Sequence, residues 1–175
     1  SITRNEFRSL YLNLISTGLE FQVTSFNPNV TTPQERRALE EESYEFYAEH
    51  YPQIDYNGIV GLEPDPTTGG VTVLPRSDQP FYFPVHLLEP VIGNEAAIDF
   101  DLFSSSSRRD TIEKAMSTWK PALTPRLQLV QETDPSAFSV ILMHPGIPVD
   151  DDDDMERPTS FSSMVIRIPD LLKRA

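Results

Sequence analysis

The stretch Phe81–Ile147 decides the fold, and it lies in four patterned segments: PFYFPVHLLEP (80–90), GNEAAIDFDLFSSSSRRDTIEKAMSTW (93–119), ALTPRLQLVQE (122–132) and AFSVILMHPGI (137–147). Apolar, aromatic and β-branched strand patterns bracket a single amphipathic helix. An Asp lies at the strand-to-helix junction, and no nucleophile motif, metal cluster or phosphate loop accompanies the pattern. Because a small curved sheet around a ligand pocket has this pattern, we expect a sensing domain and no enzyme.

Composition excludes several other classes. The chain has 175 residues, 38% of them hydrophobic, which is enough for one cored domain or a domain with a small companion. Sixteen prolines against seven glycines indicate extended segments and stiff loops and disfavour a helical bundle. A net charge of −13 argues against nucleic acid and against docking on an anionic membrane surface. The absence of cysteine excludes disulfides and thiolate zinc sites.

The sequence carries neither a signal peptide nor an apolar run long enough to cross a membrane. It begins at Ser1 without Met and ends in the helix-like PDLLKRA. We therefore expect a segment of a longer protein.

Three segments carry the chemistry of a helix start. Thr3-Arg4-Asn5-Glu6 and Thr32-Pro33-Gln34-Glu35 are capping boxes, the second with Pro at the first helical position. The helix after Thr32 is expected to end near Tyr51, before a proline. Ser107-Arg108-Arg109-Asp110 is a weaker third box, followed by apolar residues at helical spacing.

Strand patterns dominate after Ile54. The candidates are Leu19–Ser25, Ile54–Leu62, Val71–Leu74, Phe81–Leu88, Ala96–Leu102, Leu123–Gln131, Phe138–Met143 and Ser162–Ile168. Because Pro84 cannot donate to a strand ladder, the candidate that contains it should form an edge or a bulge. Helices first and strands later predict an α+β fold with an antiparallel sheet.

A series of different short motifs extends along nearly the whole chain. They are Ile2-Thr3…Glu6-Phe7, Phe26-Asn27-Pro28-Asn29-Val30, Glu35-Arg36-Arg37…Glu40, Tyr82-Phe83-Pro84-Val85…Glu89-Pro90…Gly93-Asn94, Phe100-Asp101-Leu102…Arg108-Arg109…Ala115 and Leu123-Thr124…Gln128-Leu129. With this series the chain resembles the CHASE domain, the extracytoplasmic sensor of transmembrane histidine kinases and nucleotide cyclases.

The resemblance implies two PAS-like units behind a long N-terminal stalk helix. Residues 1–147 would hold the helices and the membrane-distal, ligand-binding unit with its PAS-like antiparallel sheet. Residues 148–158 would form an acidic loop, and 159–175 part of a small membrane-proximal PAS-like closing element. It further implies an extracellular or periplasmic location, no catalysis by this segment and no cofactor. A homodimer would form in the full receptor through the stalk, and only flanking segments would touch the membrane.

In plant members of this family the ligand is cytokinin, an N6-substituted adenine, and the resemblance implies that Asp101 accepts hydrogen bonds from its ring nitrogens. Charge-assisted bonds of that kind contribute about 1.5–3 kcal/mol each. The alternative for Asp101 is local, because an Asp at the end of a strand commonly caps the helix that follows.

The resemblance also aligns Leu129 and Met143 with pocket positions, and Phe83, Val85 and Ile141 should lie on the same sheet face. Packing in the core is the alternative for all five. Met143 departs from the plant receptors, which carry a hydroxyl residue there, whereas a thioether fills space without a hydrogen bond. The expected ligand is therefore an adenine derivative or another small organic molecule.

Other polar residues receive structural interpretations. Arg108 and Arg109 lie in the first turn of a helix, where a phosphate could bind, but the adjacent Asp110 favours surface ion pairs. His144 beside the pocket could act as a pH switch, or could simply be exposed at a strand end. The run 150–154 concentrates oxygen ligands but lacks the spacing of a calcium loop, so a solvated loop is favoured.

Two functions follow from these observations. The first is an extracytoplasmic small-molecule sensor that signals by a ligand-induced conformational shift. The second is a non-sensing dimerisation or protein-interaction module with the same fold. A sizeable cavity bordered by Asp101 favours the sensor, whereas a fully packed distal unit favours the interaction module.

Overall fold

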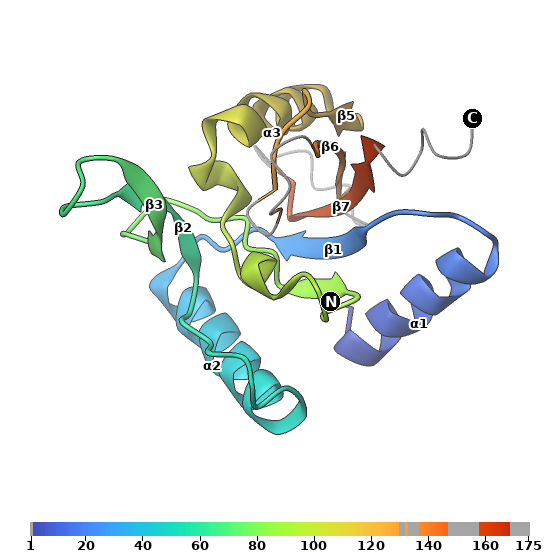
Figure 1. Cartoon of the computed structure of the whole chain (residues 1–175), viewed down its shortest axis with the longest axis horizontal. Helices are drawn as coiled ribbons and strands as arrows, with labels where there is room; N and C mark the ends of the chain where they lie inside the picture. Colours follow the sequence, from blue (N-terminus) through green and yellow to red (C-terminus); the bar gives the residue numbers. More distant parts are fainter. Residues whose placement is uncertain (1, 130–131, 133–136, 147–157, 169–175) are drawn as a thin grey trace.

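The computed structural model describes residues 2–129, 132, 137–146 and 158–168. Within these residues the helices are α1 (Arg4–Ser16), α2 (Pro33–His50) and α3 (Ser106–Thr118), with short 3₁₀ turns η1 (Glu95–Ala97) and η2 (Leu102–Ser104). The strands are β1 (Val23–Pro28), β2 (Val60–Pro64), β3 (Val71–Pro75), β4 (Leu87–Glu89), β5 (Ala122–Leu123), β6 (Ser139–Pro145) and β7 (Ser160–Arg167). The expected α+β class with an antiparallel sheet is confirmed (Figure 1).

The main sheet has the strand order β4-β1-β7-β6-β5, and every neighbouring pair in it is antiparallel. β2 and β3 form a separate hairpin that extends from one side of the molecule (Figure 1). β1 lies beside β7, so segments from near the two ends of the chain meet in the middle of the sheet.

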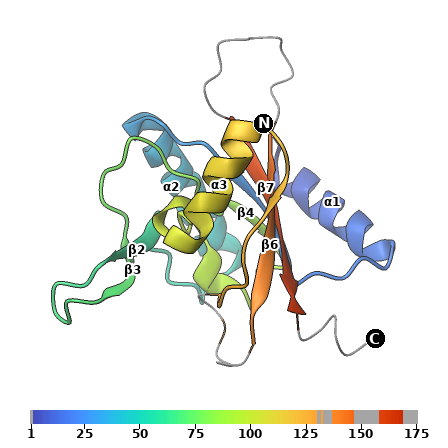
Figure 2. The same ribbon diagram turned by 90° about the horizontal axis from the view of Figure 1, so that it is seen from above.

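One face of the sheet is the more buried. Along β6, Ile141 and Met143 are buried while Leu142 and His144 are exposed, which is the alternation of a strand with one covered face. α3 packs against β5 and β6, and Figure 2 shows it on one side of β6 and β7 with α1 on the other. Ile141 and Met143 therefore share the buried face of the sheet, as expected. Phe83 and Val85, which we expected on the same sheet face, belong to no strand, so that part of the expectation is wrong.

The two strong helix-start predictions are confirmed. Thr3 and Thr32 each cap a helix, and Glu6 and Glu35 complete the two capping boxes. The third prediction was misplaced by two residues, because the N-cap of α3 is Ser105 and it makes no side-chain capping hydrogen bond. In a run of four serines, any of them can begin the helix.

Three predicted strands are largely replaced by irregular backbone. In the described part of 123–131 only Leu123 belongs to a strand, and Leu127 makes an isolated bridge. Residues 96–102 form the 3₁₀ turns with isolated bridges at Phe100 and Asp101, since Asp99 has φ 47°, which a strand does not accommodate. In the 81–88 segment only the last two residues belong to a strand, and Tyr82 and Pro84 make isolated bridges. Pro84 lacks the N–H that a continuous ladder needs.

We expected the first unit to end at residue 147, but the main sheet continues beyond that residue with β7. β7, which we expected in the small second unit, pairs with β1 from Val23↔Val165 to Pro28↔Ser160 and with β6 along its other edge. Its inward side chains Phe161 and Val165 are buried in the main core, so burial places this strand with the first unit. The acidic segment 150–154 and residues 169–175 lie outside the described residues.

Candidate functional site

A cavity of about 30 Å³ lies between the buried face of the sheet and the segment that runs from η1 into α3. The sheet contributes Val23 and Ser25 from β1, Ile141 from β6, and Ser163 and Val165 from β7. The other lining residues are Val85, Ala97, Phe100, Leu102, Arg108 and Leu129. A volume of this size holds about two water molecules.

Two larger depressions, of about 610 and 750 Å³, are open at the surface. Each already contains an ion pair, Arg4 with Glu42 in the first and Arg36 with Glu40 in the second. Ligand sites are mostly concave and apolar with a few convergent polar groups. The small cavity beside α3 has that character, and it is the candidate site.

Arg108 is the one charged side chain among the described residues that line this cavity. It projects from the first turn of α3 and is 5% exposed, and its guanidinium carbon lies 4.9 Å from the centre of the Phe100 ring. Burial lowers the pKa of Arg108 to about 10, so the group stays protonated at neutral pH. The expected surface ion pair is wrong for Arg108, because helix spacing turns it toward the core.

Two hydroxyl groups occupy the sheet side of the cavity. Ser25 and Ser163 face each other across β1 and β7, with their oxygens 2.6 Å apart. Ser25 Oγ donates to Oδ1 of the buried Asn27 at 2.9 Å, and Asn27 Nδ2 donates to the Phe161 carbonyl. The hydroxyls are thus held in a fixed orientation, and each oxygen retains acceptor capacity.

The structure brings three of the six predicted site residues to the cavity. Val85, Leu129 and Ile141 line it. Phe83 and Met143 are each 0% exposed and belong to the same apolar core, but they do not line the cavity. Asp101 is also 0% exposed, and it does not line the cavity.

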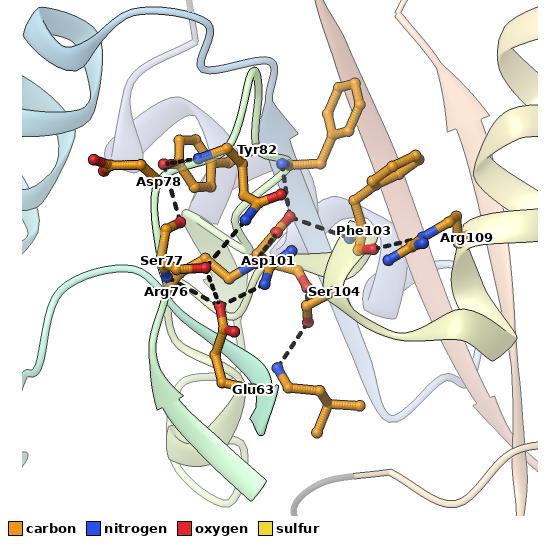
Figure 3. Close-up of polar contacts among 12 residues, drawn as sticks. Glu63, Arg76, Ser77, Asp78, Tyr82, Asp101, Phe103, Ser104 and Arg109 are labelled. Carbon is orange, nitrogen blue, oxygen red and sulfur yellow. Dashed lines mark hydrogen bonds and ion pairs between the residues drawn. The ribbon is translucent and has the colours of Figure 1, made fainter. Parts of the chain in front are cut away.

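The Asp101 carboxylate lies in a polar cluster on the side of β2 and β3 (Figure 3). Oδ2 accepts from Arg76 Nε at 2.9 Å, and Oδ1 accepts from the backbone N–H groups of Phe83 and Phe103 at 3.0 and 3.1 Å. Arg76 also pairs with Glu63. Asp101 therefore has the local role that was the alternative to ligand binding, because it caps the turn that follows it. A ligand would have to compete with Arg76 for the carboxylate.

Gly61 makes the Asp101 cluster possible. A Cβ at this position would lie 2.7 Å from Arg76 Cδ and 2.9 Å from Ser104 Cβ, closer than atoms can pack. Ser104 Oγ in turn donates to the Asp101 carbonyl at 2.6 Å. Close backbone approach of β2 therefore requires a glycine.

A second polar network joins α1, α2 and the 81–89 segment through His86. His86 Nε2 lies 2.8 Å from Glu42 Oε2, and Nδ1 lies 3.2 Å from Ser43 Oγ and 3.4 Å from Asp99 Oδ1. Arg4 of α1 donates to Glu42 and to the His86 carbonyl. Asp99 and Asp101 thus serve different networks. In a regular strand two residues at this spacing would point to the same side, but the backbone turns at Asp99, whose φ is 47°.

This network gives stability a defined pH dependence. Burial lowers the pKa of His86, but its contacts with the carboxylates of Asp99 and Glu42 outweigh burial and raise the pKa above its ordinary value. The contact with His86 lowers the pKa of Glu42 to about 2. Because the pKa of His86 is raised on folding, protonated His86 stabilises the folded state fully at pH values below its unfolded pKa of about 6.5. This stabilisation is lost as the pH rises through the pKa in the folded state. Because the pKa of Glu42 is lowered on folding, ionised Glu42 stabilises the folded state at pH values above its unfolded pKa of 4.5. This stabilisation is lost as the pH falls toward about 2.

The network therefore contributes most between about pH 4.5 and 6.5. We expect the unfolding temperature of the chain to fall more between pH 5.5 and 8.5 than that of His86→Gln, which does not titrate. Thermal unfolding followed by circular dichroism at the two pH values measures the difference. Equal falls in the two proteins would show that His86 carries no folding-linked proton. His50, half exposed at the end of α2, provides the control variant His50→Gln, which should behave as the unsubstituted chain does.

Sequence reasoning missed Arg108, Ser25 and Ser163 as site residues. A signal for Arg108 was present, because Arg108, Thr111, Ile112 and Ala115 recur at i, i+3, i+4 and i+7 and form the buried face of α3. Likewise, Ser25 and Ser163 occupy inward positions two residues from Val23 and Val165. A polar residue at an apolar position of a periodic pattern marks a candidate site.

The remaining candidates contribute little to a site. His144 is exposed on the face opposite Met143, and its Nδ1 lies 2.9 Å from the Pro145 carbonyl oxygen. Among the residues the structure describes, no group of His, Asp and Glu is arranged to hold a metal ion. In the same residues no helix combines the length and apolarity that membrane crossing requires.

Comparison with known families agrees with the sequence motifs. Residues 1–175, the whole chain, match the model of the CHASE domain. No curated protein matches the sequence. A CHASE domain is a sensor module without catalytic activity, located outside the cytoplasm in membrane receptors. The chain belongs to the CHASE domain family.

Proposed function

We propose that this domain senses a small molecule bound in the cavity between the sheet and α3. The observation that carries the proposal is the cavity itself, whose apolar wall contains a buried, charged Arg108 and two oriented hydroxyls. Ligand pockets combine apolar walls with a few placed polar groups in this way. A helix packed over one face of an antiparallel sheet, with the cavity between them, also supports a PAS-like unit.

The size of the cavity suggests how binding is coupled to a signal. About 30 Å³ admits no drug-sized molecule, so a ligand must separate α3 from the sheet as it enters. The ligand then prefers an open arrangement over the closed one, and such a preference is what shifts a conformational equilibrium. β1 and β7 line the cavity, and these strands connect to the two ends of the domain.

The parent protein in this proposal is a transmembrane receptor with a histidine kinase or nucleotide cyclase output, and the domain lies outside the cytoplasm. A homodimer of the receptor would transmit the shift. Of the predicted site residues, Val85, Leu129 and Ile141 contact the ligand directly, and Met143 and Phe83 support the wall. Asp101 would join the site only where a ligand displaces Arg76.

Filling the cavity tests the proposal. Val85→Ile adds one methylene to the wall, so we expect it to stabilise the chain by about 0.5–1 kcal/mol and to reduce ligand binding. A thermal-shift screen of adenine derivatives, amino acids and small carboxylates on both proteins measures the effect. The matched control is Val73→Ile on the exposed hairpin, which should leave both quantities unchanged. Equal responses of Val85→Ile and the unsubstituted chain to every stabilising compound would place binding elsewhere.

Two observations favour the interaction module. The first is that the cavity is small and that Asp101 does not line it, whereas a sizeable cavity bordered by Asp101 was the feature expected of a sensor. The second is the exposed apolar surface of α1. Leu10, Leu12 and Ile15 of α1 are 47%, 50% and 41% exposed, so the helix presents apolar surface to solvent. Leu12 and Ile15 lie three residues apart on one side of α1, so their replacement by Glu would disrupt a dimer built on that side. Light scattering after size exclusion measures the mass: a dimer in the unsubstituted chain and a monomer in the double variant would support this function.

A further inference from the structure

The proposed ligand cavity contains a buried positive charge that the described part of the chain does not balance. Arg108 is 5% exposed, its Nε has no hydrogen-bond partner, and no described Asp or Glu forms an ion pair with it. Its interaction is with the face of Phe100, 4.9 Å from the guanidinium carbon. By contrast, the adjacent Arg109 is exposed and donates to the Phe103 carbonyl.

The balance of energies at Arg108 is unfavourable without a partner. The cation–π contact with Phe100 offsets only part of the cost of burying the cation. Removal of a cation from water costs more than such a contact returns, even after the surroundings relax. Arginine does not escape this cost by losing its proton, because its pKa remains far above neutral pH. A buried guanidinium therefore stabilises any anion that reaches it.

We infer that the cavity binds a small organic molecule with a carboxylate group, and that Arg108 holds the carboxylate. This inference rests on the proposed function, since it takes the same cavity as the ligand site. The planar guanidinium matches a carboxylate with two parallel hydrogen bonds. The N-terminus of α3, whose Ser105 cap makes no side-chain capping hydrogen bond, adds positive potential beside it.

The rest of the cavity defines the rest of the ligand. Valine, isoleucine, leucine and phenylalanine form most of the wall, so the part of the ligand that follows the carboxylate is apolar and compact. The hydroxyls of Ser25 and Ser163 give a second polar contact on the sheet side. The protein carries a net charge of −13, which disfavours anions in general. Binding of a carboxylate must then depend on this local site.

The test uses the 175-residue chain with two series of probes of matched shape. One series contains the straight-chain carboxylates from acetate to hexanoate, and the other contains the primary amides of the same acids. We expect the carboxylates to raise the unfolding temperature and to bind at least about tenfold more tightly than the amides in titration calorimetry, the factor that a charge-assisted bond confers.

Arg108→Met removes the charge and retains the length of the side chain. Because no described residue forms an ion pair with this charge, we expect the variant to fold with an equal or higher unfolding temperature and to bind carboxylates and amides alike. Arg109→Met makes the same charge change at an exposed position and should retain the preference for carboxylates. An Arg108→Met protein that still prefers carboxylates at least tenfold would overturn the assignment.

The two proposals fail separately. If both series bind equally and Val85→Ile weakens both, the cavity is a ligand site but the carboxylate inference is wrong. If neither series binds, the carboxylate inference is also wrong, and the screen of adenine derivatives and amino acids alone decides the sensor proposal.

Discussion

Replacement of Asp101 by Ala should lower the free energy of unfolding by about 3–5 kcal/mol, the cost of removing one partner from a buried ion pair. Asp101 is 0% exposed, and Arg76, whose side chain is 8% exposed, would lose one of its two ion-pair partners among the described residues and keep Glu63. The N–H groups of Phe83 and Phe103 would also lose their acceptor. Urea unfolding followed by circular dichroism measures the change.

The control for Asp101 is Asp78→Ala. Asp78 is fully exposed and lies 3.5 Å from Arg36, so its loss should change stability by less than about 1 kcal/mol. If Asp101→Ala were as stable as Asp78→Ala but no longer responded to ligands, Asp101 would be a ligand contact and its structural role would be minor. Measurement of stability and ligand response on the same protein separates the two roles that the sequence left open.

Phe83→Ala should also lower the free energy of unfolding by about 3–5 kcal/mol, the usual cost for a buried aromatic ring. Phe83 is 0% exposed, and its ring meets Phe161 edge-on at 4.9 Å and Phe81 at 5.7 Å. The ring therefore connects the 81–85 segment to β7. Urea unfolding of this variant provides the measurement.

Tyr44→Ala is the control for Phe83, because Tyr44 is 61% exposed on α2 and its removal should cost less than about 0.5 kcal/mol. A loss below about 1 kcal/mol in Phe83→Ala would mean that the core around Phe83 relaxes freely. In that case Phe83 would be as available to a ligand as Val85 and Leu129.

The parts of the fold that follow from local chemistry could be predicted from the sequence. The capping boxes at Thr3 and Thr32 place two helices, since both the cap and the apolar face lie within a few residues. Alternation of apolar residues places β6 and most of β7. Membership in the family followed from the order of short motifs, and the whole chain matches that family.

The parts that depend on contacts between distant segments could not be predicted. A pattern of alternating residues says that Ser160–Arg167 is a strand, but it does not say that β1 and β6 are its neighbours. The ion pair between Arg76 and Asp101 joins residues 25 positions apart, and it required Gly61 as well. Arg108 was interpreted as a surface residue because its neighbour Asp110 offered a local partner, whereas the structure buries it against Phe100.

The central claim is that a small molecule binds between the sheet and α3. Methyl NMR of the chain labelled at Ile, Leu and Val tests it most directly, with butyrate and, separately, adenine as added probes. We predict that at least one probe shifts the methyl resonances of Val85, Leu129 and Ile141, while Val71 and Val73 of the distant hairpin do not move. Cavity methyl resonances that stay in place with both probes would contradict the claim.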